Sequence, residues 1–175
     1  MHPTADTSEV VNFRGVARRV MRALGGLGEV MAELDDSTYE RIQTLCAEGD
    51  TLAQKANYPD ALKKYWAAWA LLPEPQTDWK AATWILAAIG DANFLVGDFV
   101  AGQDTLSSAM HCPDALGNPF LHLRLGQCQF ELGNLERAAD ELARAYMGAG
   151  AEIFEGGDKY FAFLKTRLLP PPGGW

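Results

Sequence analysis

The 175-residue chain lacks any hydrophobic run long enough to cross a lipid bilayer, which requires about 18 consecutive apolar residues. Its longest apolar stretches, WAAWALL and ATWILAAIG, are much shorter. The beginning of the chain also lacks the continuous apolar core of a secretory signal, because arginines interrupt VNFRGVARRVMRAL throughout. We therefore expect a cytoplasmic protein without a membrane span.

Cysteine and histidine are scarce, with three of each. Cys46, Cys112 and Cys128 form no CxxC pair, which argues against a disulfide framework and favours reduced thiols. The chain also contains no glycine-rich phosphate loop, no GxSxG and no HExxH. The sequence therefore predicts no catalytic residues, no metal site and no cofactor, so we expect a protein that is not an enzyme.

Basic residues are outnumbered, which gives a net charge of -8. This charge excludes general affinity for nucleic acid, because the phosphate backbone attracts a basic surface. Residues 1–30 differ from the rest: they hold four arginines and three carboxylates, a net charge of +1, which leaves -9 for the remainder. An acidic main body favours a basic protein partner.

A pattern of one small, one capping and one apolar residue recurs three times along the chain. The copies are Ala56-Asn57-Tyr58, Gly97-Asp98-Phe99 and Gly133-Asn134-Leu135, at intervals of 41 and 36 residues. A short Asn or Asp side chain can accept a hydrogen bond from a free amide in the first turn of a helix. Each triplet therefore predicts the start of the second helix of a helical hairpin.

Small residues recur in the same frame. A glycine lies seven residues before each triplet (Gly49, Gly90 and Gly126), and a small residue lies five residues after the triplet's first member (Ala61, Gly102 and Ala138). Glycine inside a helix costs about 1 kcal/mol relative to alanine, so its recurrence indicates close helix packing, as between Gly126 and Ala138. The remaining inward positions are predicted to be Tyr65, Leu106 and Leu142, and then Ala68, Ala109 and Ala145.

These positions resemble the tetratricopeptide repeat (TPR), a helix-turn-helix unit of about 34 residues. The resemblance covers residues 37 to 150, and Pro73 closes the first copy as in the family. It implies an all-α fold: a right-handed α-solenoid of three TPR-like hairpins with an N-terminal extra helix and a C-terminal capping helix. The capping helix is expected in EGGDKYFAFLKTRL, where Tyr160, Phe161, Phe163 and Leu164 cover the last repeat.

We divide the chain into a basic amphipathic extension (residues 1–30), a TPR-like domain (31–168) and a Pro/Gly tail (169–175). The extension has three interpretations: a helix that docks on a partner or membrane surface, a helix that covers the start of the solenoid, or sequence upstream of a native start at Met31. Trp175 in the tail either packs back on the domain or stays free.

In TPR proteins the first helix of each repeat lines a concave groove that commonly binds peptides or protein segments. Transferred to this chain, the resemblance implies a groove with an aromatic floor and acidic edges. Family members that bind acidic chaperone tails carry Lys, Arg and Asn along this face. None of these residues occupies the transferred positions here, which disfavours an acidic tail as the partner. The predicted partner-binding residues are Gln43, Asp50, Gln54, Trp84, Asp91, Phe94, Leu95, Phe120, Leu123, Gln127, Phe130 and Glu131.

Two functions fit a stand-alone module that holds one protein partner, either a basic one or one with an exposed hydrophobic segment. The helical pattern with the tail FLKTRLLPPPGGW resembles small bacterial TPR proteins that accompany polymorphic secreted toxins, which implies an immunity protein. Chain size and helix order also resemble TPR-type secretion chaperones, which hold a translocator protein. A folded toxin domain needs a shaped surface, whereas a chaperone client threads as an extended chain.

Overall fold

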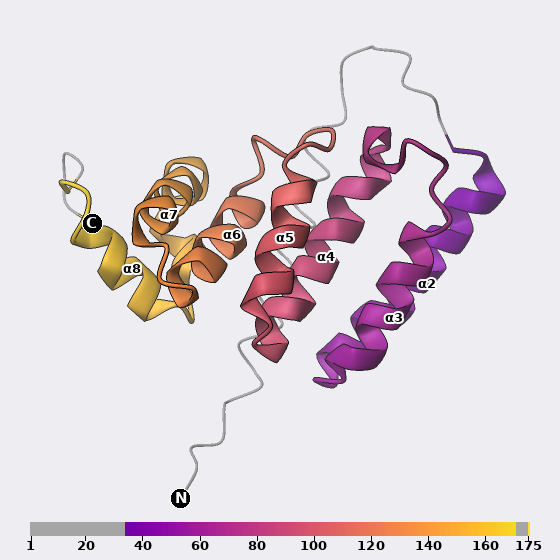
Figure 1. Ribbon diagram of the computed structural model, residues 1–175, viewed down its shortest axis with the longest axis horizontal. Coiled ribbons are helices and arrows are strands. Elements are labelled where there is room, and N and C mark those ends of the chain that lie inside the picture. The colour runs from indigo at the N-terminus through magenta and orange to yellow at the C-terminus, as the bar shows by residue number, and fades with distance from the viewer. Residues whose placement is uncertain (1–33, 171–174) are drawn as a thin grey trace, which may run out of the picture. The chain divides into compact units, whose positions relative to one another are not determined.

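A computed structural model describes residues 34–170 and residue 175, and within these residues every regular element is a helix. The extension at residues 1–30 lies outside the described residues. The α-helices are α2 (Asp36–Gln54), α3 (Tyr58–Trp69), α4 (Lys80–Val96), α5 (Phe99–Ala109), α6 (Pro119–Glu131), α7 (Leu135–Ala149) and α8 (Asp158–Lys165). Two 3₁₀ turns, η1 (Gln76–Asp78) and η2 (Ala151–Phe154), lie between them (Figure 1).

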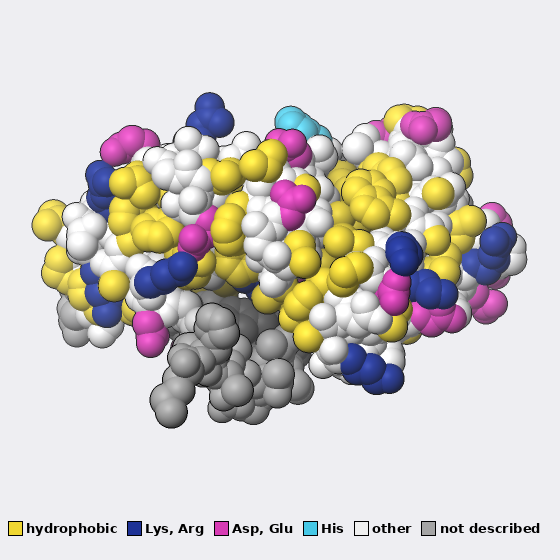
Figure 2. Space-filling view, turned by 60° about the horizontal axis from the view of Figure 1, so that its bottom comes forward, with side chains coloured by type: hydrophobic (Ala, Val, Ile, Leu, Met, Phe, Trp, Pro, Cys, Tyr) yellow, Lys and Arg dark blue, Asp and Glu magenta, His cyan; other side chains and the backbone are white. Residues whose placement is uncertain are grey.

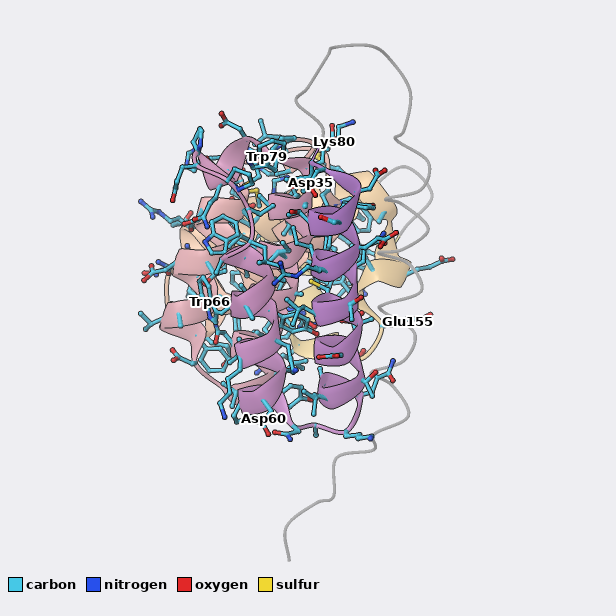
Figure 3. The ribbon with its side chains drawn as sticks, turned by 90° about the vertical axis from the view of Figure 1, so that its right-hand side faces the viewer. Asp35, Asp60, Trp66, Trp79, Lys80 and Glu155 are labelled. Atoms are coloured by element: carbon cyan, nitrogen blue, oxygen red, sulfur yellow. The ribbon has the colours of Figure 1, made fainter. Side chains whose placement is uncertain are left out.

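The helices pack as three hairpins in chain order. The most extensive packing joins α2 with α3, α4 with α5 and α6 with α7, and α3 and α5 pack in turn against the helix that opens the next hairpin. Figure 1 shows this succession, and Figure 3 looks along it with α2 and α3 side by side and Asp60 near the turn that joins them. The predicted all-α solenoid of three hairpins with a C-terminal helix is confirmed.

The second helices begin where the triplets predict, at Tyr58, Phe99 and Leu135. Capping by the triplet's polar side chain occurs in one copy only: Oδ1 of Asp98 accepts a hydrogen bond from the Ala101 amide at 3.0 Å. Asn57 and Asn134 occupy the cap positions without accepting such a bond. The Asn57 side chain instead donates to Asp60 at 2.9 Å, so the triplet marks the helix start more reliably than it supplies the cap.

Each recurrent glycine accommodates a large side chain of the partner helix, and in the second hairpin a Cβ at Gly102 would lie 3.5 Å from the carbonyl oxygen of Gly90. A Cβ atom at Gly126 would lie 2.8 Å from Cγ of Leu142. Likewise, a Cβ at Gly90 would overlap Leu106, and one at Gly49 would meet the Tyr65 ring at 2.5 Å. The large inward residues of the second helices therefore fill the space that each glycine leaves.

The solenoid core consists of the predicted inward side chains together with the apolar positions of the first helices. The six predicted inward residues (Tyr65, Leu106, Leu142, Ala68, Ala109 and Ala145) are at most 1% exposed, as the three-copy frame requires. The segment EPQTDWK forms the longer connection that carries η1, and there the Trp79 indole donates to the Pro73 carbonyl at 2.8 Å.

The chain beyond the third hairpin folds back as η2 and α8. Tyr160 and Leu164 are buried, while Phe161 and Phe163 are half-buried, so α8 covers apolar surface as predicted. Trp175 packs back on the domain, with its ring centroid 5.4 Å from that of Tyr146 and 5.7 Å from that of Phe161. The closing segment thus belongs to the folded domain.

Candidate functional site

The predicted binding residues lie on the first helices of the hairpins, on a surface that we call the first-helix face. It is formed by Gln43, Asp50 and Gln54 of α2, by Trp84, Asp91, Phe94 and Leu95 of α4, and by Phe120, Arg124, Phe130 and Glu131 of α6. The helix α4 also contacts α6, whereas no comparable packing joins α3 with α5 or α5 with α7. The first helices of the last two hairpins therefore lie closer together than their second helices, as on the inner side of a curved solenoid.

A buried cation joins the α4 and α6 parts of the first-helix face. Arg124 is 8% exposed, and its Nη2 lies 2.6 Å from Oδ1 of Asp91. Its guanidinium carbon lies 4.3 Å from the centroid of the Phe94 ring and 5.6 Å from that of Phe120, distances at which a cation is attracted to an aromatic ring. Arg124 thus contacts two aromatic rings and one carboxylate of the predicted groove at the same time.

None of the positions transferred from the family holds Lys, Arg or Asn, but the basic residue Arg124 lies beside them. Arg124 directly follows Leu123, a predicted binding residue, and this position in the sequence could have indicated a basic side chain near the groove. Arg124 is nevertheless not available to bind an acidic partner, because it is already bound within the chain. Besides Asp91, it donates through Nη1 to Oε1 of Gln127 at 2.7 Å.

The predicted acidic edges are largely neutralised within the chain. Asp91 pairs with Arg124, and Oε1 of Glu131 lies 2.6 Å from Nζ of Lys159 and accepts the Tyr160 hydroxyl at 2.7 Å. Burial acts to raise the pKa of Glu131, but the bonds from Lys159 and Tyr160 outweigh it and lower the pKa, so the carboxylate is held ionised. Asp50 accepts the Tyr65 hydroxyl at 2.8 Å. Reversing these charges would therefore disturb folding as well as binding.

Two predicted binding residues are inaccessible. Leu123 is 0% exposed and Gln127 is 4% exposed, which corrects their assignment to a partner-binding surface. Gln127 lies against the closing segment: η2 packs on α6 and α7, and a Cβ at Gly157 would be 3.4 Å from Nε2 of Gln127. We call this part of the first-helix face, over α6, the covered section.

Four other residues of the first-helix face reach the surface of the described part of the chain. Gln43 and Gln54 are exposed on α2, while Trp84 and Leu95 are half-buried on α4. The members of each pair are eleven residues apart, which places them on one side of their helix. We call these four residues the open section. On the side of the molecule that Figure 2 shows, hydrophobic patches are interspersed with charged side chains, and the described residues form no continuous acidic surface in that view.

A pocket of about 490 Å³ lies away from all predicted binding residues, between the start of α6 and α7. It is lined by Leu116, Gly117, Pro119, His122, Asp140, Ala143, Arg144, Met147 and Gly148. The His122 ring faces two acceptors: Nδ1 lies 2.6 Å from Oε2 of Glu141, and Nε2 lies 2.9 Å from the Leu116 carbonyl oxygen. The bond with Glu141 raises the pKa of His122, against the effect of burial.

The described residues offer little for catalysis. No group of three or more His, Cys, Asp or Glu side chains among them is arranged to hold a metal ion. The three cysteines are free and buried, and burial raises the pKa of both Cys46 and Cys128 to about 12, so these thiols are poor nucleophiles at neutral pH. Within residues 34–170, no helix is both long and apolar enough to cross a membrane.

Comparison with known proteins identifies the fold. No protein-family model and no curated protein matches the chain. Among solved structures, it is similar to the Yersinia enterocolitica type III secretion chaperone SycD in complex with a peptide of the translocator YopD, with a TM-score of 0.59 and 16% identity over 73% of this chain and 92% of that chain. It is also similar to MamA, with a TM-score of 0.53 and 17% identity over 94% of this chain and 93% of that chain. With the three hairpins and the repeat frame, these similarities show a solenoid of the tetratricopeptide-repeat type.

Proposed function

We propose that this protein is a cytoplasmic interaction module that holds an extended segment of one protein partner on the open section of its first-helix face. The observation that carries the proposal is that the same face already holds a segment of its own chain over α6, while no described residue covers Gln43, Gln54, Trp84 and Leu95 in this way. Half-buried aromatic and aliphatic side chains with amides beside them are typical of peptide-binding surfaces.

The internal pairing of charges favours an extended client over a folded toxin. Blocking a basic toxin surface would depend on accessible carboxylates. Asp91 and Glu131 are instead bound to Arg124 and Lys159. The open section offers apolar contact and amide hydrogen bonds, which suit an extended hydrophobic segment. The similarity to SycD, whose structure contains a translocator peptide, agrees with a chaperone function of this type.

The proposal can be tested with a tryptophan pair. Tagged full-length protein, a Trp84→Ala variant and a Trp66→Ala variant would capture partners from the native lysate, which mass spectrometry then identifies. Trp66 is a matched control because it is 45% exposed on α3, off the first-helix face (Figure 3). Peptides that tile the captured protein would then be titrated against each variant by calorimetry.

We expect one peptide to bind the wild type and the Trp66→Ala variant equally, and to bind Trp84→Ala about 30-fold more weakly. That factor corresponds to the loss of about 2 kcal/mol that is usual for a central aromatic contact. Thermal unfolding of both variants controls for damage to the fold. Binding by the intact partner alone, with no active peptide, would contradict the extended-client proposal and favour an immunity function. Equal binding by all three proteins would exclude the open section.

A further inference from the structure

The helix α8 occupies the covered section through one aromatic side chain and one cation. The Tyr160 ring centroid lies 6.3 Å from that of Phe94 on α4 and 5.4 Å from that of Phe130 on α6. Its hydroxyl donates to Glu131 at 2.7 Å, and Lys159 pairs with the same carboxylate oxygen at 2.6 Å. We call the site formed by Phe94, Phe130 and Glu131 the Tyr160 cleft.

The two sides of α8 contact different surfaces. Lys159, Tyr160 and Phe163 face the first-helix face, where the Phe163 ring centroid lies 5.0 Å from that of Phe130. Phe161 faces the end of the solenoid, stacked 4.9 Å from Phe154 and 5.9 Å from Tyr146. The contacts that fill the Tyr160 cleft are therefore separate from those that tie α8 to η2 and α7.

Several features make α8 easier to displace than the other helices. It has eight residues, and an isolated helix of that length is not stable in water. The Lys159 side chain is 60% exposed, so its ion pair with Glu131 is screened by solvent. Contacts between α8 and α7 are also far sparser than those between α6 and α7.

We propose that α8 is a displaceable occupant of the Tyr160 cleft, and that this cleft binds a partner segment in which an aromatic residue directly follows lysine or arginine. The proposal extends the proposed function, since the partner segment held on the open section would continue into the cleft as α8 leaves it. Phe94 and Phe130 supply the aromatic contacts, and Glu131 supplies both the countercharge and the acceptor for a tyrosine hydroxyl. A permanent cap, which solenoids also use, would make the same contacts but would never open alone.

Native-state hydrogen exchange on the full chain distinguishes these two roles. A displaceable α8 opens by itself, so its amides should exchange on the order of 100-fold faster than those of α6 and α7. A permanent cap would open only when the third hairpin unfolds, and exchange in α8 would then match exchange in α6 and α7. The second result would overturn the proposal.

Binding in trans tests the chemistry of the cleft. The probe is a fluorescein-labelled peptide of the sequence EGGDKYFAFLKTRL, followed by fluorescence anisotropy with the full-length wild type and with Tyr160→Ala and Lys159→Ala variants. Weakening the internal occupant raises the open fraction of the cleft. Tyr160→Ala should therefore bind the peptide about ten-fold more tightly than the wild type, and Lys159→Ala, which removes only a solvent-screened ion pair, about two- to five-fold more tightly. A peptide with alanine in place of its tyrosine is the matched control and should not bind.

Lys159→Ala keeps the experiment decisive if Tyr160→Ala does not fold, because an exposed lysine contributes little to the core. Equal peptide affinity for the wild type and the variants, or no binding to any of them, would overturn the proposal. Trp84→Ala, which lies in the open section, should bind this peptide as the wild type does. The lysate experiment and the peptide experiment can therefore fail independently.

Discussion

A single added methyl group tests the packing of the hairpins. Gly90 lies against Leu106 so closely that a Cβ would overlap its side chain, and Leu106 is fully buried. We expect Gly90→Ala to lower the free energy of unfolding by about 1–3 kcal/mol, the usual cost of overpacking, despite the better helix propensity of alanine. Guanidinium denaturation measures the change.

Gly117→Ala is the matched control, because a Cβ there would meet no atom within 4 Å. Its free energy of unfolding should stay within about 0.5 kcal/mol of the wild-type value. If Gly90→Ala were instead more stable than the wild type, the interface between α4 and α5 would have space for the added methyl group, contrary to the close packing of Gly90 against Leu106.

His122 makes stability depend on pH. Its two ring nitrogens face the Glu141 carboxylate and the Leu116 carbonyl, so only the doubly protonated ring donates to both. The bond with Glu141 raises its pKa above 6.5, against burial and the nearby Arg144. A raised folded-state pKa means that the stabilisation is complete below pH 6.5 and is lost as pH rises through the folded-state value.

We therefore expect the free energy of unfolding to fall with increasing pH on the alkaline side of 6.5, and to fall less in His122→Gln and Glu141→Gln variants. The other charged groups at this site, Asp140 and Arg144, form their own ion pair at 3.1 Å and are unchanged in both variants. Urea denaturation across that pH range provides the measurement. An equal slope in wild type and His122→Gln would mean that another group titrates.

At the scale of elements, α4 and α6 are joined by the buried pair of Asp91 and Arg124. Their side chains are 13% and 10% exposed. Removing one partner of a buried pair leaves an uncompensated charge and usually costs about 3–5 kcal/mol. We expect a loss of this size for Arg124→Met, measured by guanidinium denaturation.

A double variant, Arg124→Met/Asp91→Leu, should be more stable than Arg124→Met alone, because it leaves no isolated charge in the interface. The two substitutions would then be strongly non-additive. If the changes in the free energy of unfolding were additive, Asp91 would be adequately solvated without Arg124. The stabilisation by Arg124 would then come from its contacts with the Phe94 and Phe120 rings.

Which elements could be predicted from the sequence depends on the range of the interactions that form them. The starts of α3, α5 and α7 follow from small and polar residues within each triplet, so the three-copy frame located them. The contact between Tyr160 and Phe94 joins α8 to a helix of the second hairpin, and the pairing of Arg124 with Asp91 joins two hairpins. These contacts depend on how the hairpins stack, which a repeat frame does not specify.

For the candidate site, the repeat frame located the helices that carry the predicted residues but not the neighbours of those residues in space. The frame places Trp84, Phe94, Phe120 and Phe130 on first helices, where the structure has them. It treats each position alone, however, and so counted Glu131 and Asp91 as free carboxylates although each has a basic neighbour in space. It also missed the burial of Leu123, and that of Gln127, which lies against the chain after α7.

At the scale of the whole solenoid, each hairpin packs mainly against its immediate neighbours, and the described part of the chain has no extensive contact between α2–α3 and α6–α7. Stability in such a stack is approximately a sum over hairpins and the interfaces between them, so damage at one end should be felt chiefly there. Gly49 and Gly126 occupy the same repeat position at opposite ends, which makes them a matched pair for testing this.

We expect Gly49→Ala, which drives a methyl group into Tyr65, to increase hydrogen exchange in α2 and α3 more than in α6 and α7. Gly126→Ala, which meets Leu142, should produce the reverse pattern. Mass spectrometry of peptides from each hairpin, with the wild type as reference, provides the measurement. If hydrogen exchange became faster uniformly along the chain in both variants, the solenoid would unfold as a single cooperative unit. A partner bound on α2 and α4 would then stabilise α8 as strongly as the hairpins that it contacts. If hydrogen exchange became faster only near each substitution, a partner bound on the open section would have little effect on the opening of α8. The open section and the covered section would then contribute separately to binding.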